Sequence, residues 1–377
     1  MIANLPAGDA GLYLYIPSFA GGGAERIFIR IANYLANEGH NVCFIVNHDG
    51  GPLRDMLSDQ VNLQVLGIER GPKAIFALAG VLRKHKPKVL ISVMTRSNIV
   101  ALLASRLAGG NTRVIACERN HYSTILNDFD PVRRWGVDRC VRWLYPNALA
   151  VIGNTPGVTQ DVATAAGVSP ENTGVIPNPA PDTDELDAAR SDAMDHPWFN
   201  DDKPVAVAIG RLMPQKDYPT MLEAVAKSGS DLRLAVLGTG PDQAALEAYA
   251  EKLGIGDRVE FLGFRMDRFA YLVRADVFLL SSITEGFPNA LIEAVAAGIP
   301  AVSTDCAGGG AQEIMGSEFP ERIVPVGNAS AMADVIKSIL EARAAGDETT
   351  ERVSAERVAE RFQIGATAHA FLARAVA

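Results

Sequence analysis

Two carboxylates in the segment EGFPNALIE, residues 285–293, have a spacing that suits a binding site. Glu285 lies on a glycine-containing loop, and Glu293 follows eight residues later, about one turn into a predicted helix at 289–297. Carboxylates there can accept hydrogen bonds from sugar or ribose hydroxyls, while the N–H groups at the helix start face phosphate. The alternative makes Glu285 a capping acid and Glu293 part of a solvated face. A charge between Ile292 and Ala294 is costly without a partner, which favours the binding site.

A second segment, GRLMPQKD at residues 210–217, contains two basic residues and directly follows a predicted strand. Arg211 and Lys216 stand five residues apart on this loop. A bidentate guanidinium and a flexible ammonium suit a diphosphate. The alternative is a pair of solvated surface charges, and the position beyond a strand end favours the binding loop.

Three consecutive glycines precede a predicted helix at 24–38 in the segment GGGAER, residues 21–26. Gly22 and Gly23 let the backbone approach a ligand, and the helix start offers N–H groups to a phosphate or sugar oxygen. Arg26 stands where the dinucleotide fingerprint needs its third glycine, which disfavours a plain dehydrogenase. The alternative is a tight strand-to-helix turn.

Short apolar runs alternate with helical periodicity along the whole chain, a pattern typical of α/β proteins with parallel sheets. The predicted strands are 12–16, 42–47, 63–66, 89–93, 114–117, 149–152 and 174–176, then 205–209, 232–237, 259–262, 277–280, 301–303 and 323–326. A helix is also predicted at 243–252. Ligands of open parallel sheets bind beyond the carboxyl ends of the strands. We therefore expect two Rossmann-like parallel-sheet domains whose loops face one interdomain cleft.

The domain boundaries follow from composition. The first domain is expected at 1–180 and the second at 203–350, separated by a proline-containing, acid-rich linker at 181–202. Residues 351–377 have a helical pattern, and we expect them to pack back toward the first domain.

Composition excludes several classes of protein. The 377 residues are 48% hydrophobic and 21% charged, as in soluble globular chains. No apolar run approaches the roughly 18 residues of a membrane-spanning helix, and no basic n-region indicates a signal peptide. The net charge of −9 argues against nucleic-acid binding. Four widely separated cysteines argue against a zinc site or disulfides and favour the cytoplasm: Cys43, Cys117, Cys140 and Cys306.

The order of these segments, followed by AGIPAVSTD at 297–305, resembles the large fourth family of retaining glycosyltransferases with the GT-B fold. The resemblance covers essentially the whole chain and is more specific in the second half. It implies transfer of a hexosyl or N-acetylhexosaminyl group from a nucleotide-sugar, with UDP expected, to an acceptor hydroxyl. It further implies that the first domain binds the acceptor and the second the nucleotide-sugar, and that the reaction retains the anomeric configuration with no required metal and no cofactor.

The resemblance also implies roles for individual residues. Arg211 and Lys216 would hold the donor diphosphate and neutralise the leaving group, while Glu285 would grip the sugar hydroxyls and Glu293 the ribose. The other residues that it implies in donor binding are Gly22, Gly23, Gly210, Phe264, Arg265, Phe287, Asn289 and Leu291.

One segment departs from the family pattern. Many relatives place a histidine after the fifth strand of the first domain, whereas this chain reads CERNH at 117–121. Arg119 and His121 are both candidates for that role, because a cation there would stabilise charge on the donor. The alternative for His121 is a purely structural histidine.

A basic zone marks the first half of the chain. Residues 73–143 carry 13 Lys/Arg and 4 Asp/Glu, a net of +9. Within the zone, a predicted helix interleaves Trp135 and Trp143 with arginines 133, 134, 139 and 142. Such a face predicts peripheral contact with an anionic membrane. The alternative is a core-packing amphipathic helix with a solvated basic edge.

Together these features lead to the expectation of an enzyme at the cytoplasmic face of the bacterial inner membrane. Its acceptor would be a lipid-linked saccharide in polysaccharide or glycan assembly. Two alternatives stay open at this point: a nucleotide-sugar epimerase of the same architecture, and a non-catalytic nucleotide-binding protein.

Overall fold

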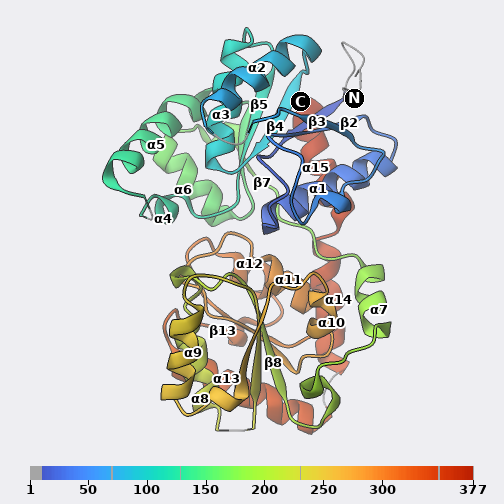
Figure 1. The fold of residues 1–377 in the computed structure, drawn as a ribbon, viewed down its shortest axis with the longest axis vertical. Coiled ribbons are helices and arrows are strands. Elements are labelled where there is room, and N and C mark those ends of the chain that lie inside the picture. Colours follow the sequence, from blue (N-terminus) through green and yellow to red (C-terminus); the bar gives the residue numbers. More distant parts are fainter. Residues whose placement is uncertain (1–10, 69–70, 128, 230, 347–348, 377) are drawn as a thin grey trace. The chain divides into compact units, whose positions relative to one another are not determined.

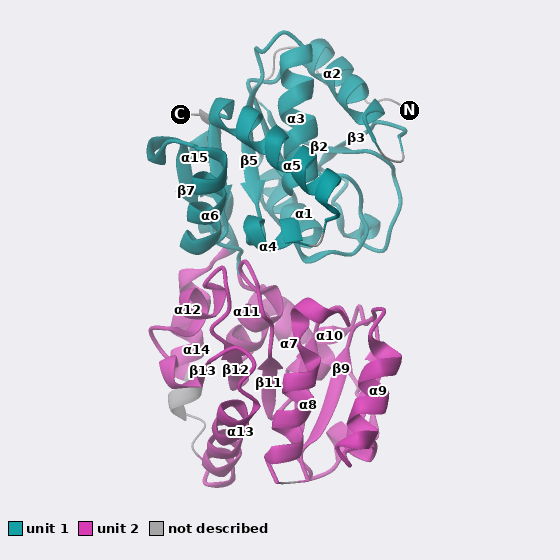
Figure 2. Ribbon diagram, turned by 90° about the vertical axis from the view of Figure 1, so that its left-hand side faces the viewer, with its two compact units in different colours: residues 1–179, 364–377 teal, residues 180–363 magenta. Residues whose placement is uncertain are grey.

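The chain forms two compact units in this computed structural model, which describes residues 11–68, 71–127, 129–229, 231–346 and 349–376. Unit 1 comprises Met1–Pro179 and Ile364–Ala377, and unit 2 comprises Ala180–Gln363 (Figure 2). Each unit contains one parallel sheet with helices on both faces (Figure 1).

The sheet of unit 1 has the strand order β3-β2-β1-β4-β5-β6-β7. Its strands are β1 (Leu12–Tyr15), β2 (Val42–Val46), β3 (Asn62–Val65), β4 (Val89–Val93), β5 (Arg113–Glu118), β6 (Ala150–Gly153) and β7 (Thr173–Val175). Alternate residues of β1 enter different cores: Leu12 and Leu14 lie on one face, and Tyr13 and Tyr15 on the other.

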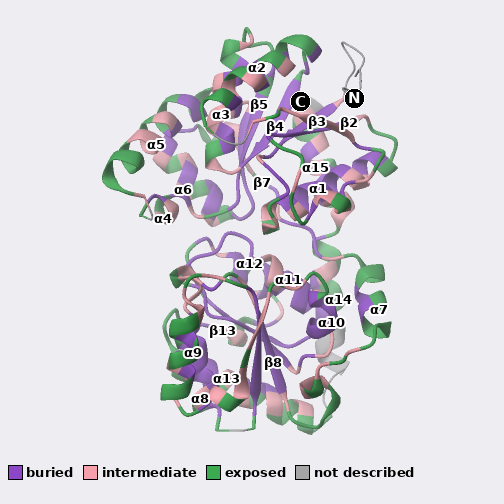
Figure 3. Cartoon of the chain, in the orientation of Figure 1, coloured by how far each residue is buried: buried purple, intermediate pink, exposed green. Residues whose placement is uncertain are grey.

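Helices cover both faces of this sheet, so its inner strands are among the most buried segments, while the edge strands β3 and β7 are partly exposed (Figure 3). On one face lie α1 (Gly23–Asn37), whose stripe includes Ile27, Ile31 and Leu35, and α15 (Ile364–Val376), which packs against α1. The other face carries α2 (Lys73–His85), α3 (Thr95–Leu107), α5 (Pro131–Leu144) and α6 (Pro156–Ala166). The short helix α4 (Tyr122–Asn127) follows β5.

The sheet of unit 2 has the order β10-β9-β8-β11-β12-β13. Its strands are β8 (Val205–Ile209), β9 (Arg233–Leu237), β10 (Val259–Gly263), β11 (Val277–Leu280), β12 (Ala301–Thr304) and β13 (Ile323–Val324). One face packs against α8 (Tyr218–Lys227), α9 (Gln243–Lys252) and α13 (Ala329–Ala344). The other packs against α7 (Thr183–Ser191), α10 (Arg268–Leu272), α11 (Asn289–Ala296), α12 (Gly310–Met315) and α14 (Thr349–Arg361).

The structure confirms two Rossmann-like parallel-sheet units, but it corrects two of the expected segments. Residues 181–202 are not a free linker: they contain α7, which buries Leu186 and Ala189 in the core of unit 2 while its acids stay exposed. The segment 351–377 is not one element either. Helix α14 packs on α11 in unit 2, and α15 packs on α1 in unit 1.

Glu118, the last residue of β5, has a buried carboxylate. The carboxylate of Glu118 accepts hydrogen bonds from the Tyr145 hydroxyl, from Thr95 Oγ1 at 2.9 Å and from Asn98 Nδ2 at 3.1 Å. Burial raises the pKa of Glu118 to about 6 in spite of these donors. The group therefore binds a proton more tightly in the native state than in the unfolded chain.

This difference predicts a pH-dependent stability. The free energy of unfolding falls as the pH rises from the unfolded pKa of 4.5 to the native pKa of about 6, because the native state must then ionise a buried acid. The loss amounts to about 2 kcal/mol. Glu118→Gln should abolish this loss, so its stability relative to wild type should rise across that interval in urea titrations. Parallel pH profiles for wild type and variant would contradict the prediction, and exposed Glu171→Gln is the control.

Candidate functional site

Lys216 and Glu285 come from loops that follow neighbouring strands. Lys216 ends a short 3-10 turn (Pro214–Lys216) after β8, and Glu285 lies on the loop after β11. Strands β8 and β11 pair directly, with Ala206 opposite Val277. The strand order reverses direction at this pair, which is where open α/β sheets bind their ligands.

The two side chains form an ion pair. Lys216 Nζ contacts Glu285 Oε1, and Ser282 Oγ donates to the same oxygen at 2.7 Å. Exposure is low, at 20% for the Lys216 side chain and 9% for that of Glu285. Each charge thus neutralises the other, which avoids the penalty of an isolated buried ion. Binding of a phosphate by Lys216 and of hydroxyl groups by Glu285 stays a prediction.

Backbone contacts fix the two loops to one another. Gln215 Nε2 donates to Thr284 O at 2.8 Å, and Ile283 N donates to Gln215 O at 2.9 Å. Ser281 Oγ donates to Lys216 O at 2.8 Å. Since these bonds flank both charged residues, the positions of Lys216 and Glu285 are set by the same network.

Two glycines permit a close backbone approach beside the pair. Gly308 has φ +103°, and a Cβ atom there would lie 1.7 Å from Glu285 O. Gly238 has φ +155°, and its Cβ would lie 1.8 Å from Gly210 O. Any other residue would push these loops apart. The repeated glycines at 238–240 and 308–310 were the only sequence signal for this packing.

Arg211 and Gly210 lie at the start of the same loop. Gly210 N donates to Leu237 O at 3.0 Å, which anchors the loop to β9. The Arg211 side chain is exposed and makes no ion pair or hydrogen bond with any residue in the described ranges. Its guanidinium is therefore available to an anionic ligand.

Glu293 pairs with a residue that sequence reasoning missed. Arg268 Nε donates to Glu293 Oε2 at 2.9 Å, and Arg268 Nη2 donates to Oε1 at 2.7 Å. Both residues are buried, and the Arg268 guanidinium lies over the Phe269 ring. These two parallel hydrogen bonds hold the Glu293 carboxylate in one orientation. No sequence motif indicated Arg268, because the pair joins α10 to α11.

If Glu293 binds ribose, its fixation by Arg268 should govern recognition of the ribose hydroxyls. Arg268→Lys keeps the charge but loses the two parallel hydrogen bonds, so UDP should bind roughly tenfold more weakly. The preference for UDP over its 2′,3′-dideoxy analogue should largely disappear, as measured by calorimetry. Equal weakening of both ligands would instead indicate general damage to the site, and an unchanged melting temperature controls for folding.

The remaining residues predicted for donor binding differ in how far their side chains are buried. Phe264 follows β10 and is 51% exposed, and neighbouring Arg265 is held by Asp267 at 2.6 Å. Asn289 begins α11. Phe287 is buried, with its ring 5.1 Å from that of Phe362. The Phe287 side chain therefore packs in the core of unit 2.

Leu291 belongs to the core. Its side chain is fully buried in the core of unit 2, and its N–H donates to Pro288 O at 3.1 Å. A role of Leu291 toward the donor stays a prediction.

In unit 1, the carboxylate of Glu25 lies against the glycine segment 21–23. Gly22 caps α1 and Gly23 is its first residue. A Cβ at Gly22 would lie 2.2 Å from Glu25 Oε2, so the Glu25 carboxylate folds back over the loop. Burial raises the pKa of Glu25. A role of Gly22 and Gly23 toward phosphate or acceptor stays a prediction.

Arg119 and His121 have different surroundings. Arg119 is buried between the Phe28 and Phe371 rings, and its Nη1 donates to Asn178 Oδ1 at 3.1 Å. Its Nε and Nη2 are buried without a hydrogen-bond partner among the described residues, and a catalytic role for Arg119 stays a prediction. His121 is partly exposed, and its Nδ1 lies 3.3 Å from Asp161 Oδ2.

Within the described parts of the chain, no group of three or more His, Cys, Asp or Glu side chains is placed to hold a metal ion. Likewise, no helix there is long and apolar enough to cross a membrane.

Two family models match the chain, one in each unit. Residues 22–179 match the model of the glycosyl transferase 4-like domain, and residues 190–357 match that of the glycosyl transferases group 1.

Two curated relatives are similar to the chain. One is the N-acetylgalactosamine-N,N'-diacetylbacillosaminyl-diphospho-undecaprenol 4-alpha-N-acetylgalactosaminyltransferase of Campylobacter jejuni, 27% identical over 66% of each protein. The other is the lipopolysaccharide core biosynthesis glycosyltransferase LpsE of Rhizobium meliloti, 28% identical over 85% of this chain and 86% of LpsE.

Solved structures share the fold. Anabaena HepE in complex with UDP and glucose superposes with a TM-score of 0.78 at 20% identity, covering 97% of this chain and 98% of HepE. WaaG, a glycosyltransferase involved in lipopolysaccharide biosynthesis, gives a TM-score of 0.68 at 17% identity, covering 96% and 97%. The two matched models together span most of both units, so the chain belongs to the family 4 glycosyltransferases and has their GT-B fold.

Proposed function

We propose that this glycosyltransferase moves a sugar from a UDP-sugar to a hydroxyl of a lipid-linked saccharide, with retention at the anomeric carbon. The Campylobacter relative is named for an undecaprenol-linked acceptor, and HepE was solved with UDP and glucose. Both names support the choice of donor and acceptor.

The observation that carries the proposal is the Lys216–Glu285 ion pair where the strand order reverses. A bound donor would place its diphosphate against Lys216 and Arg211 and its sugar hydroxyls against Glu285. As the bond from the anomeric carbon to the phosphate oxygen breaks, negative charge grows on UDP, and the two cations stabilise it. The acceptor oxygen then bonds to the same face of the anomeric carbon, and its proton passes to the departing diphosphate.

These side chains also supply the positive charge that a metal would otherwise bring to the diphosphate. We therefore propose a reaction that requires no metal and no cofactor besides the donor.

The acceptor would be reached at a membrane surface. On α5, Val132 and Trp143 are 80% and 60% exposed. Arg106 of α3 lies over the Trp143 ring at 4.4 Å. Exposed aromatics with arginine neighbours suit the headgroup region of a bilayer, while Val141 and Leu144 hold the helix to the core.

Unit 1 should accordingly bind anionic vesicles reversibly. Replacing the four arginines of α5 with serine should abolish sedimentation with anionic liposomes, and salt should weaken wild-type binding as the Debye length falls from about 10 Å at 0.1 M to about 3 Å at 1 M. The control removes the same charge from exposed cations of unit 2: Lys203, Lys227, Lys252 and Arg357. Equal pelleting with neutral and anionic vesicles would contradict the prediction.

A transfer assay tests the proposed function itself. Purified protein is incubated with labelled UDP-sugars and with membranes from the native organism after deletion of the gene. Label should enter the lipid extract with release of one UDP per sugar. Interconversion of free UDP-sugars without acceptor would instead indicate an epimerase.

A further inference from the structure

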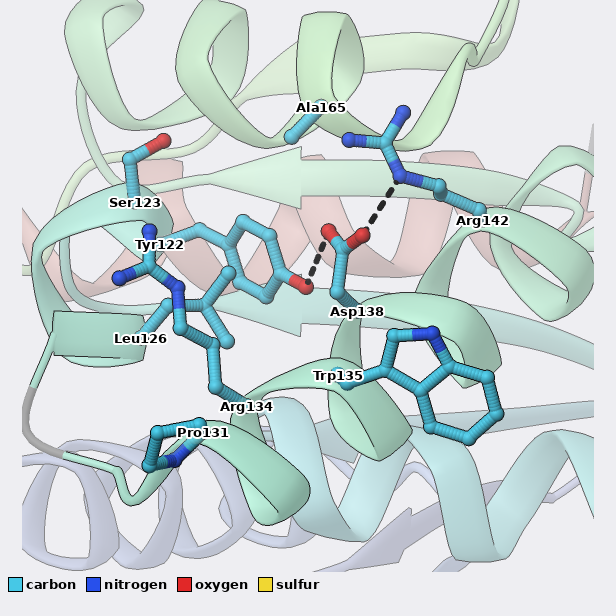
Figure 4. Close-up of a pocket in the computed structure, with 9 residues that line it drawn as sticks. All are labelled: Tyr122, Ser123, Leu126, Pro131, Arg134, Trp135, Asp138, Arg142 and Ala165. Carbon is cyan, nitrogen blue, oxygen red and sulfur yellow. Dashed lines mark hydrogen bonds and ion pairs between the residues drawn. The ribbon is translucent and has the colours of Figure 1, made fainter.

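A groove on unit 1 is lined, apart from His121, by residues that were not assigned to the donor. Helices α4, α5 and α6 enclose a cavity of about 430 Å³ (Figure 4). A second hollow of about 580 Å³ shares Ser123, Arg142 and Ala165 with it. Both volumes fall in the range of small-ligand sites. We call the two hollows together the α4–α6 groove.

Hydrogen bonds to neighbouring side chains fix the polar groups of the groove. Arg142 Nε donates to Asp138 Oδ2 at 2.7 Å, and the buried Tyr122 hydroxyl lies 3.4 Å from Asp138 Oδ1 (Figure 4). Across the groove, Ser123 Oγ donates to Asp161 Oδ1 at 2.5 Å. These contacts fix Asp138 in the first hollow and Asp161 in the second, and Arg142 lines both.

The charges of the groove balance. Two guanidinium groups, of Arg134 and Arg142, stand against the carboxylates of Asp138 and Asp161, and the His121 ring of the second hollow lies 3.3 Å from Asp161 Oδ2. The Arg134 side chain is exposed and makes no ion pair or hydrogen bond with any of the described residues. A phosphate would meet attraction and repulsion in equal measure. A neutral, hydroxyl-rich ligand could instead donate to the carboxylates and accept from the guanidinium groups.

An aromatic surface completes the lining. Trp135 is 70% exposed, and its indole lies beside Asp138 at one side of the cavity (Figure 4). An exposed indole offers a flat apolar face of the size of a sugar ring, next to polar groups that fix orientation. Trp143, 60% exposed on the same helix, does not line the groove.

From this combination we infer that the α4–α6 groove binds a neutral saccharide, with a pyranose ring against Trp135 and its hydroxyls on Asp138 and Arg142. Its role as the subsite for the sugars already present on the acceptor rests on the proposed function. It would make the enzyme select acceptors by their existing glycan.

Calorimetric titration of the full chain tests the inference, with N-acetylchitotetraose, isomaltotetraose and inorganic pyrophosphate as probes. At least one saccharide should bind in the millimolar range or tighter. Trp135→Ala should weaken this binding roughly tenfold or more, and Arg142→Met at least about fivefold. The matched controls Trp143→Ala and Arg139→Ser should leave it unchanged, and all four variants should bind UDP like wild type.

Three outcomes would overturn the inference: no binding of either saccharide, equal weakening by Trp135→Ala and Trp143→Ala, or binding of pyrophosphate in place of the saccharides. In each case intact UDP binding would leave the proposed function standing. Loss of UDP binding in the wild-type protein would count against the proposed function instead.

Discussion

Arg211→Ala and Lys216→Ala are each expected to lower kcat/KM for transfer by about 2–4 kcal/mol of transition-state stabilisation, roughly 30- to 1,000-fold. Negative charge grows on the diphosphate as the glycosidic bond breaks, so a cation beside it contributes most in the transition state. Steady-state kinetics with the labelled donor measure the effect. Turnover within about threefold of wild type in both variants would refute the assignment.

The two variants differ in what they do to folding. Lys216→Ala leaves the buried Glu285 carboxylate without its cation, which costs stability. Arg211→Ala removes an exposed side chain, so its melting temperature should match that of wild type. Exposed Lys227→Ala removes the same charge in the same unit and serves as the control.

Glu285→Gln should impair transfer far more than nucleotide binding. The amide keeps the size of the side chain and can still accept from Ser282, but it loses the charge opposite Lys216. Since the proposed partners of Glu285 lie on the sugar, turnover should fall by roughly 100-fold or more while UDP affinity stays within about threefold. Parallel kinetics and calorimetry on one preparation separate the two effects.

If UDP affinity fell as much as turnover, Glu285 would act on the diphosphate or on the loop itself. The double variant Lys216→Ala with Glu285→Gln distinguishes these cases. It removes both charges of the pair, so it should recover the stability lost in Lys216→Ala without recovering activity.

The sheets could be predicted from sequence because buried parallel strands are short, apolar and bounded by turns. The strands of both units, for example β8 at Val205–Ile209, begin and end within two residues of the predicted positions. The segment 181–202 was misjudged, since its acids conceal the small apolar face of α7. Composition alone does not separate a linker from a solvated amphipathic helix.

The site was predictable where a charge follows a strand end, as at Lys216 and Glu285. Their contact depends on the neighbouring positions of β8 and β11, which the sequence does not specify. Arg268 escaped notice because an arginine in a polar turn has many surface uses. The catalytic role of Arg119 stays a prediction, and nothing in the sequence shows the Phe28 and Phe371 rings that enclose this residue.

Titration of the purified chain with UDP in the presence of EDTA tests the central claim most directly, namely that unit 2 holds the donor diphosphate with its own cations. We expect one UDP per chain, a rise in stability of about 2.7 kcal/mol at 100 times the dissociation constant, and marked weakening in Lys216→Ala. Absence of binding, recovery of binding only with added Mg²⁺ or Mn²⁺, or equal affinity in Lys216→Ala would contradict the claim.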